Sequence, residues 1–147
     1  MGGQPWFYFV KYRQDADRAF EELRQREFEA GRYNPVIKFP NFPTGPESPA
    51  PGAKHHTIQA ARDEAAADGT RSILDMDRIG QRHDFGVVVS LRIEKLLELY
   101  GTATPTREAV DANMGFLEEI HRGHGVYFVV YYNGKPSEIC FAGYSYD

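Results

Sequence analysis

The sequence has one cysteine among its 147 residues, and this scarcity excludes several kinds of protein. A single thiol cannot close an intramolecular disulfide, and it cannot supply the paired cysteines of most structural zinc sites. Cys140 lies in an apolar, strand-like stretch, which favours a packed thiol in a reducing compartment. We therefore expect a cytoplasmic protein with no metal site and no cofactor.

Positive charge and long apolar runs are also missing. The 17 Lys and Arg are outnumbered by 21 Asp and Glu, so the basic surface typical of nucleic-acid binders is not expected. The densest apolar run, residues 126–132, is far shorter than the roughly 20 residues that span a membrane. The first residues lack the charged and apolar regions of a signal peptide. These features predict a soluble protein that binds neither nucleic acid nor membrane.

The common catalytic motifs are absent as well. The sequence contains no Walker phosphate loop, no GxGxxG after a strand, no GxSxG, no HExxH and no EF-hand loop. Each of these motifs would place a nucleophile, a metal ligand or a phosphate contact at a fixed spacing. Their absence favours a binding protein over an enzyme.

The residues that are abundant suit a folded core. Ten Phe, nine Tyr and one Trp provide large apolar surfaces. The length fits one domain of about 100–200 residues, and a chain of this size buries roughly two-thirds of its unfolded surface. We expect residues 1–147 to form a single compact domain.

The first half of the chain predicts a strand and two helices. Aromatic and β-branched residues over 6–12 are typical of a buried strand. Asp15 is a suitable N-cap for the following helix, and Gly31 is placed to end it. Thr57 is a suitable N-cap for a second helix, from residue 58 to about 67.

In the second half, residues 71–76 and 85–89 are short strand candidates. Helices are predicted after Ser90, ending at Gly101, and from Pro105 to Gly123. Two apolar runs then flank Asn133-Gly134, a pair that favours a hairpin because both central residues of a type I′ turn take positive φ. The predicted fold is α+β, with a mixed, mainly antiparallel sheet, about four helices and a C-terminal β-hairpin.

A proline-rich segment interrupts this pattern: six of the nine prolines lie between residues 35 and 51. Proline has no amide donor and fixes φ, which excludes helices and central strands from most of this segment. We expect a long ordered loop over 39–54, because Phe39 and Phe42 have apolar surface to bury and proline reduces the entropy lost on ordering. The alternative is a flexible linker.

Three side chains are candidate catalytic residues: His55, His56 and Asp75. A neutral imidazole suits a general base, although adjacent residues in extended chain point to opposite sides and are not expected to share a metal ion. Asp75 and Asp77 alternate along a predicted strand, where a carboxylate pair would hold Mg²⁺ or divide acid and base roles. The simpler interpretation gives the histidines a packing role and the carboxylates surface ion pairs.

His121 and His124 are three residues apart, which is also a spacing for metal ligands on a helix. Gly123 is expected to end the helix between them, however. A positive charge near a helix C-terminus is favourable against the helix dipole, and this interpretation requires no ligand.

A binding cleft is the hypothesis that combines these signals. It would lie between the proline-rich loop, the end of the first helix and the start of the second. Arginine would supply charge for an anionic ligand, and tyrosine a stacking surface or hydrogen bond. The predicted ligand-binding residues are Glu27, Arg32, Tyr33, Phe42, His55 and His56.

Two function classes follow. The preferred one is a non-catalytic binding module, an acidic partner or inhibitor of another protein. The alternative is a small hydrolase or transferase that uses a loop histidine with Glu or Asp on an anionic, nucleotide-like or phosphorylated ligand. The predicted partners are accordingly a protein or a small anionic ligand.

Overall fold

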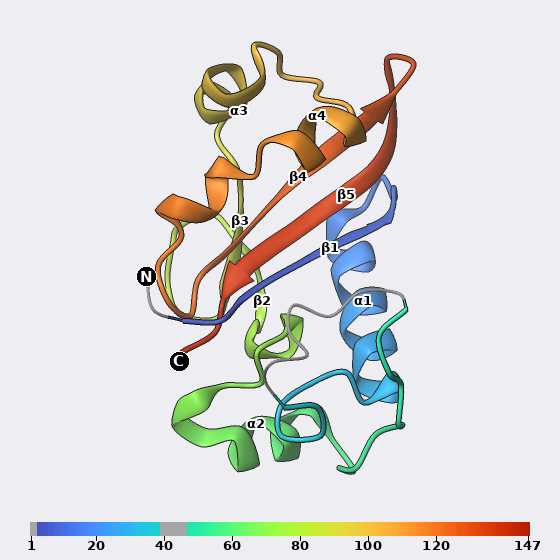
Figure 1. Ribbon diagram of the computed structural model, residues 1–147, viewed down its shortest axis with the longest axis vertical. Helices are drawn as coiled ribbons and strands as arrows, with labels where there is room; N and C mark the ends of the chain where they lie inside the picture. Colours follow the sequence, from blue (N-terminus) through green and yellow to red (C-terminus); the bar gives the residue numbers. More distant parts are fainter. Residues whose placement is uncertain (1–2, 39–46) are drawn as a thin grey trace.

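A computed structural model describes residues 3–38 and 47–147. Five strands form one sheet in the order β1-β5-β4-β3-β2 (Figure 1). In chain order the strands are β1 (Pro5–Lys11), β2 (Arg78–Gly80), β3 (Val87–Ser90), β4 (Gly125–Tyr132) and β5 (Lys135–Tyr144). The helices in the described residues are α1 (Ala16–Ala30), α2 (Ile58–Ala65), α3 (Ile93–Tyr100) and α4 (Arg107–Ala112), with 3₁₀ turns η1 (Ala66–Asp68), η2 (Ile73–Asp75) and η3 (Gly115–Glu119).

The sheet is mixed. β5 lies between β1 and β4 and pairs antiparallel with both, and these are the two long pairings. The pairings of β4 with β3 and of β3 with β2 are parallel and short. β5 therefore runs opposite to the other four strands. The predicted α+β class is confirmed.

The predicted hairpin joins β4 to β5. Asn133 has a φ of 50° and Gly134 a φ of 77°, the left-handed conformation that a type I′ turn needs at both central positions. Tyr132 pairs with Lys135 across the turn. The hairpin predicted from Asn133-Gly134 is therefore confirmed.

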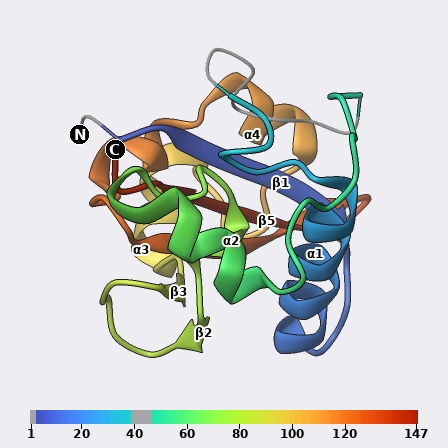
Figure 2. The same ribbon diagram turned by 90° about the horizontal axis from the view of Figure 1, so that it is seen from below.

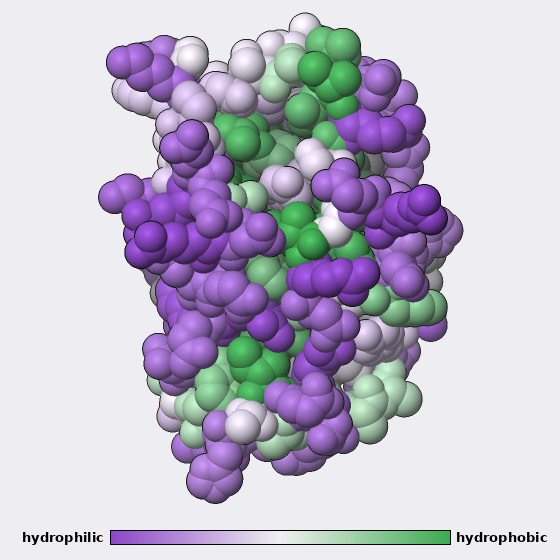
Figure 3. Space-filling model, turned by 180° about the vertical axis from the view of Figure 1, so that it is seen from behind, coloured by the Kyte–Doolittle hydropathy of each residue, from purple (hydrophilic) through white to green (hydrophobic). Residues whose placement is uncertain are grey.

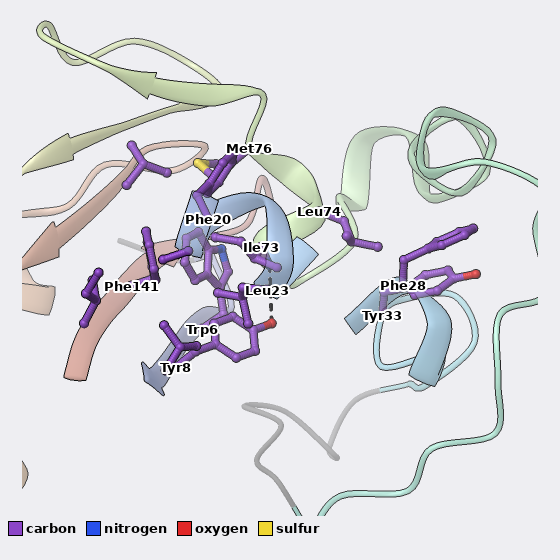
Figure 4. Packing of buried hydrophobic residues seen from close by; sticks show 14 of the residues in the cluster. Trp6, Tyr8, Phe20, Leu23, Phe28, Tyr33, Ile73, Leu74, Met76 and Phe141 are labelled. Carbon is purple, nitrogen blue, oxygen red and sulfur yellow. Dashed lines mark hydrogen bonds between the residues drawn. The ribbon is translucent and has the colours of Figure 1, made fainter. Parts of the chain in front are cut away.

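Side chains alternate between the two faces of the sheet and form two apolar clusters. On β1, Tyr8 belongs to the cluster covered by α1, α2 and η2, whereas Phe7 packs on the cluster covered by α3, α4 and η3. Figure 2 shows α4 to one side of β1, with α1 and α2 to the other. In the first cluster, the Tyr8 hydroxyl accepts a hydrogen bond from the amide of Ile73 at 3.3 Å (Figure 4).

The helix ends follow their capping residues. The Asp15 carboxylate accepts hydrogen bonds from the amides of Asp17 and Arg18, and Gly31 ends α1 in the left-handed conformation. The Thr57 hydroxyl accepts the amide hydrogen of Ala60 at the start of α2. These three caps lie where the sequence predicts them.

The strand predicted at 71–76 is wrong. Residues 73–75 form η2, and the strand follows at 78–80. The Ser72 hydroxyl accepts the amide hydrogen of Leu74, and the Asp75 carboxylate turns back to the amide of Thr70. Such local side-chain bonds satisfy the backbone in place of strand pairing.

The helix predicted from Pro105 to Gly123 is also wrong in extent, because it is interrupted. α4 ends at Ala112, and the side-chain oxygen of Asn113 accepts the amide hydrogen of Gly115 to form a turn before η3. Ser90 is not a cap either: it is the last residue of β3, a strand that begins two residues later than predicted, and α3 starts after Arg92.

Residues 39–46 of the predicted proline-rich loop, including Phe42, lie outside the described residues. Residues 47–54 contain no helix or strand. Their backbone packs on the end of α1, where the amide of Gly52 donates to the carbonyl of Ala30 at 2.9 Å. Across the described residues, no helix has the length and apolar character needed to cross a bilayer.

Candidate functional site

Tyr33 and His55 lie together beside the end of α1. Tyr33 is fully buried and stacks on Phe28, with ring centroids 5.9 Å apart (Figure 4). Its hydroxyl oxygen is 2.8 Å from Nδ1 of His55 and accepts the amide hydrogen of Lys54 at 3.2 Å. Two of the predicted ligand-binding residues are therefore in contact, although they are 22 positions apart in the chain.

The second nitrogen of His55 faces α2. Nε2 lies 2.6 Å from Oε1 of Glu64, a side chain that is 62% exposed. The imidazole thus bridges a hydroxyl and a carboxylate, which is the connectivity of an activated hydroxyl. Burial raises the pKa of Tyr33, however, and its oxygen already accepts a backbone hydrogen bond. This arrangement holds the end of the loop against α1 and leaves the hydroxyl closed to a substrate.

Glu27 and Arg32 form a separate ion pair at the end of α1. The Glu27 carboxylate is buried and accepts from Nε of Arg26 and from Nε of Arg32, each at 3.2 Å. His56 is exposed, and among the described residues it makes no hydrogen bond or ion pair. Among the predicted cleft residues in the described part of the chain, Tyr33 therefore contacts His55, and Glu27 contacts Arg32. Their polar groups bond to each other.

Asp75 is buried and lies in η2, not on an exposed strand. One carboxylate oxygen accepts from the amide and the hydroxyl of Thr70, and the other accepts from the hydroxyl of Ser145 at 2.9 Å. Burial raises the pKa of Asp75 above its ordinary value. Asp77 is exposed and pairs with Arg62, so the two carboxylates do not form a common site.

A pocket that the sequence does not predict lies on the face of the sheet covered by α3, α4 and η3. Its volume is about 300 Å³, and its wall comes from the end of β3, the start of α3, η3 and the start of β4. Polar and charged side chains contribute much of this wall: His83, Ser90, Arg92, Lys95, Glu119, His121 and His124. No spacing in the sequence predicts this group, because the parallel pairing of β3 with β4 brings its members together.

The outward face of α3 is apolar at two positions. Ile93 is 54% exposed and Leu97 is 49% exposed, and the two residues are one helical turn apart. Figure 3 shows hydrophobic surface at the upper end of the molecule, over α3. Between and beside these residues, Glu94 and Glu98 are also exposed. This face, formed by Ile93, Glu94, Leu97 and Glu98, is called the α3 face below.

Comparison of the chain with protein-family models, curated proteins and solved structures gives no match in any of the three. Among the described residues, no group of three or more His, Cys, Asp or Glu side chains is arranged to hold a metal ion.

Proposed function

We propose that this chain is a non-catalytic binding module whose partner is another protein. The observation that carries the proposal is the α3 face, where Ile93 and Leu97 expose large aliphatic side chains on the same side of one helix. Scattered exposed hydrophobic residues are common, but a pair at i and i+4 forms a continuous contact surface. Aliphatic pairs of this kind anchor a helix face in a partner's groove.

The residues with catalytic chemistry support binding over catalysis. The Glu27 carboxylate is held by two arginines, and the Asp75 carboxylate is buried and fully engaged. The Tyr33 hydroxyl is buried beneath His55 and Lys54. A nucleophile or base that acts on a substrate has to be reachable, and these groups are not.

The charge around the α3 face indicates the partner's chemistry. Glu94 and Glu98 stand beside the aliphatic pair, Glu98 also pairs with Lys95, and the whole chain carries a net charge of −4. The complementary surface is an apolar groove with lysine or arginine at its rim. The proposed partner is therefore a basic protein, and charge attraction would speed its association at low salt.

The test compares three forms of the tagged chain in pull-downs from cells of the source organism, followed by titration of the purified partner. We expect a basic protein to bind the unchanged chain with an affinity that falls as salt rises. The double variant I93D/L97D is expected to lose at least about 100-fold in affinity, since two apolar anchors are replaced by charges. Tyr132 is 70% exposed at the distant hairpin, so Y132D is the matched control and should bind normally.

Equal binding by all three forms, or a partner without basic character, would overturn the assignment to the α3 face. Circular dichroism of the double variant establishes that the fold is intact. Because both altered side chains are about half exposed, the fold is expected to tolerate them.

A hydrolase or transferase that uses His55 is the second candidate. The observation in its favour is that the His55 imidazole bridges the Tyr33 hydroxyl and the Glu64 carboxylate. Hydrolysis of 4-nitrophenyl phosphate or acetate that is abolished in H55A and retained in H56A would support this candidate. Equal rates in the two variants would remove it.

A further inference from the structure

The pocket beside α3 is partly open to solvent, and nitrogen-bearing side chains outnumber carboxylates in its wall. Arg92 and Lys95 come from the start of α3, His83 comes from the loop after β2, and His121 and His124 come from the segment before β4. Aliphatic and aromatic side chains, including Phe116 and Val126, form the rest of the wall. Arginine, lysine and imidazole in one partly apolar pocket are the donor set that binds oxyanions.

The three imidazoles are packed against one another. His83 and His124 stack with centroids 6.0 Å apart and planes inclined by 10°, and the rings of His121 and His124 are 5.7 Å apart. The ring of Phe85 packs edge to face with that of His124, with centroids 5.4 Å apart. Nδ1 of His124 is buried and has no hydrogen-bond partner among the described residues. An unpartnered buried nitrogen is unfavourable, so the packing of these rings carries a free-energy cost.

One positive charge in the pocket wall, that of Arg92, is available to an anion. Arg92 makes no ion pair among the described residues. Lys95 lies 2.6 Å from Glu98 and 3.0 Å from Glu119, and Glu119 also lines the pocket. The one carboxylate in the wall is therefore already paired with the lysine. The first amides of α3 have no side-chain cap, so the positive end of this helix adds to the field of Arg92.

Burial lowers the pKa of His124, and the neighbouring His83 and His121 lower it further, while Asp84 acts in the opposite direction. The imidazole of His124 is therefore harder to protonate than an isolated imidazole. A bound anion would oppose this effect, because it stabilises the protonated form of His124. Anion binding and proton uptake by His124 are therefore linked.

We propose that this pocket binds a small oxyanion of the phosphate class, held by Arg92 and by the cluster of His83, His121 and His124. The ligand is either free phosphate or the phosphate group of a small molecule. At about 300 Å³ the pocket is larger than one phosphate group, and its apolar wall suits the remainder of a small phosphorylated compound. The site is distinct from the aliphatic pair of the α3 face, since neither Ile93 nor Leu97 lines it, although Glu98 of that face pairs with Lys95 of the pocket wall.

Sulfate is the probe for the first test, because its charge stays at −2 from pH 5 to pH 8, so that any pH dependence of binding comes from the protein. Sulfate is titrated into ¹⁵N-labelled protein at constant ionic strength, and the imidazole resonances are followed by NMR. We expect saturable shifts of the His83, His121 and His124 resonances with a Kd of about 1 mM or tighter, and none for His56. The affinity is expected to increase as the pH falls, by up to about tenfold per pH unit for each proton taken up.

Two variants separate the contributions. R92Q is expected to weaken sulfate binding by about tenfold at every pH and to leave the pH dependence unchanged. H124Q is expected to flatten the pH dependence. The matched controls are R82Q and H56Q, which alter exposed residues of the same types outside the pocket wall.

Several results would overturn the proposal. These are the absence of saturable shifts in the unchanged protein, an affinity that does not rise at low pH, and equal effects of R92Q and R82Q. These results need only the unchanged protein, R92Q and R82Q, so the proposal can be tested even if H124Q fails to fold. A comparison of phenyl phosphate with inorganic phosphate then distinguishes the two sources: tighter binding of phenyl phosphate indicates a phosphorylated molecule, and equal binding indicates the free anion.

Discussion

The hydroxyl oxygen of Tyr33 lies 2.8 Å from Nδ1 of His55 and joins two parts of the chain that no secondary structure connects. The same oxygen accepts the amide hydrogen of Lys54. Tyr33 lies just beyond the Gly31 cap of α1, and His55 lies shortly before α2. One buried phenol therefore fixes where the proline-rich segment ends.

The first prediction concerns this phenol. Y33F removes the oxygen but keeps the ring that stacks on Phe28, so the Lys54 amide and the His55 nitrogen lose their partner. We expect the free energy of unfolding to fall by about 1–2 kcal/mol, measured by urea denaturation. Y132F is the control and should change stability by only a few tenths, because Tyr132 is 70% exposed. Equal effects of the two changes would contradict the tethering role.

The second prediction separates the two bonds of His55. Glu64 is 62% exposed, so its contact with Nε2 is an ordinary surface pair and E64Q should destabilise the fold by less than about 0.5 kcal/mol. H55Q also loses the bond to Tyr33 and should destabilise it by about 1 kcal/mol or more. Thermal unfolding of both variants in the same buffer checks this order. The reverse order would show that the carboxylate is the more important partner.

The third prediction concerns Asp75, which Thr70 and Ser145 surround with donors. D75N places an amide group, itself a donor, where the carboxylate accepts three hydrogen bonds. We expect a loss of about 2–3 kcal/mol of stability at pH 7. The matched control is D77N, because Asp77 is exposed and should tolerate the change with a much smaller loss.

Asp75 also predicts a direction for the pH dependence. Its folded-state pKa is raised above the ordinary value of 3.8, so the folded chain holds this proton more firmly than the unfolded chain does. The part of the stability that comes from protonating Asp75 is therefore complete below pH 3.8 and is lost as the pH rises through the folded-state pKa. The stability difference between the unchanged protein and D75N should decrease from pH 4 upward. A difference that grows over this range would contradict the raised pKa.

The fourth prediction compares two helix-ending glycines. Gly31 and Gly101 both have left-handed φ, 75° and 69°. A Cβ on Gly31 would collide with the backbone of Gly52, whereas a Cβ on Gly101 would meet nothing within 4 Å. G101A should therefore cost only the conformational strain, about 1 kcal/mol, and G31A at least 1–2 kcal/mol more. If urea denaturation shows similar losses of stability for G31A and G101A, the 47–54 segment moves aside at little cost and the predicted collision is wrong.

The parts of the fold that the sequence predicts are those set by local chemistry. Asn133-Gly134 needs only its own φ values to form a hairpin, and Asp15 and Thr57 cap with their own side chains. The strand predicted over 71–76 is wrong because the side chains of Ser72 and Asp75, and not a neighbouring strand, bond the backbone there. β2 has only three residues, which is too few for any periodicity to show.

The side chains of the pocket could not be grouped from the sequence. His83 and His124 are far apart in the chain and become neighbours only through the parallel strands β3 and β4. The sequence predicts His121 and His124 at the end of a helix, but the segment before β4 is a 3₁₀ turn followed by a loop. Burial of Tyr33 and Asp75 depends likewise on packing between distant elements.

The position of β5 has a consequence for the order in which the molecule can assemble. β1 is near the start of the described chain, yet its only strand partner is β5, which ends at residue 144. During synthesis the backbone of β1 therefore stays without its strand partner until β5 has been made. Contacts of such long sequence separation slow folding and leave an unpaired edge exposed meanwhile. A chain that stops before β5 would lack the strand that joins β1 to β4, and its first strand would be left free to pair with another molecule.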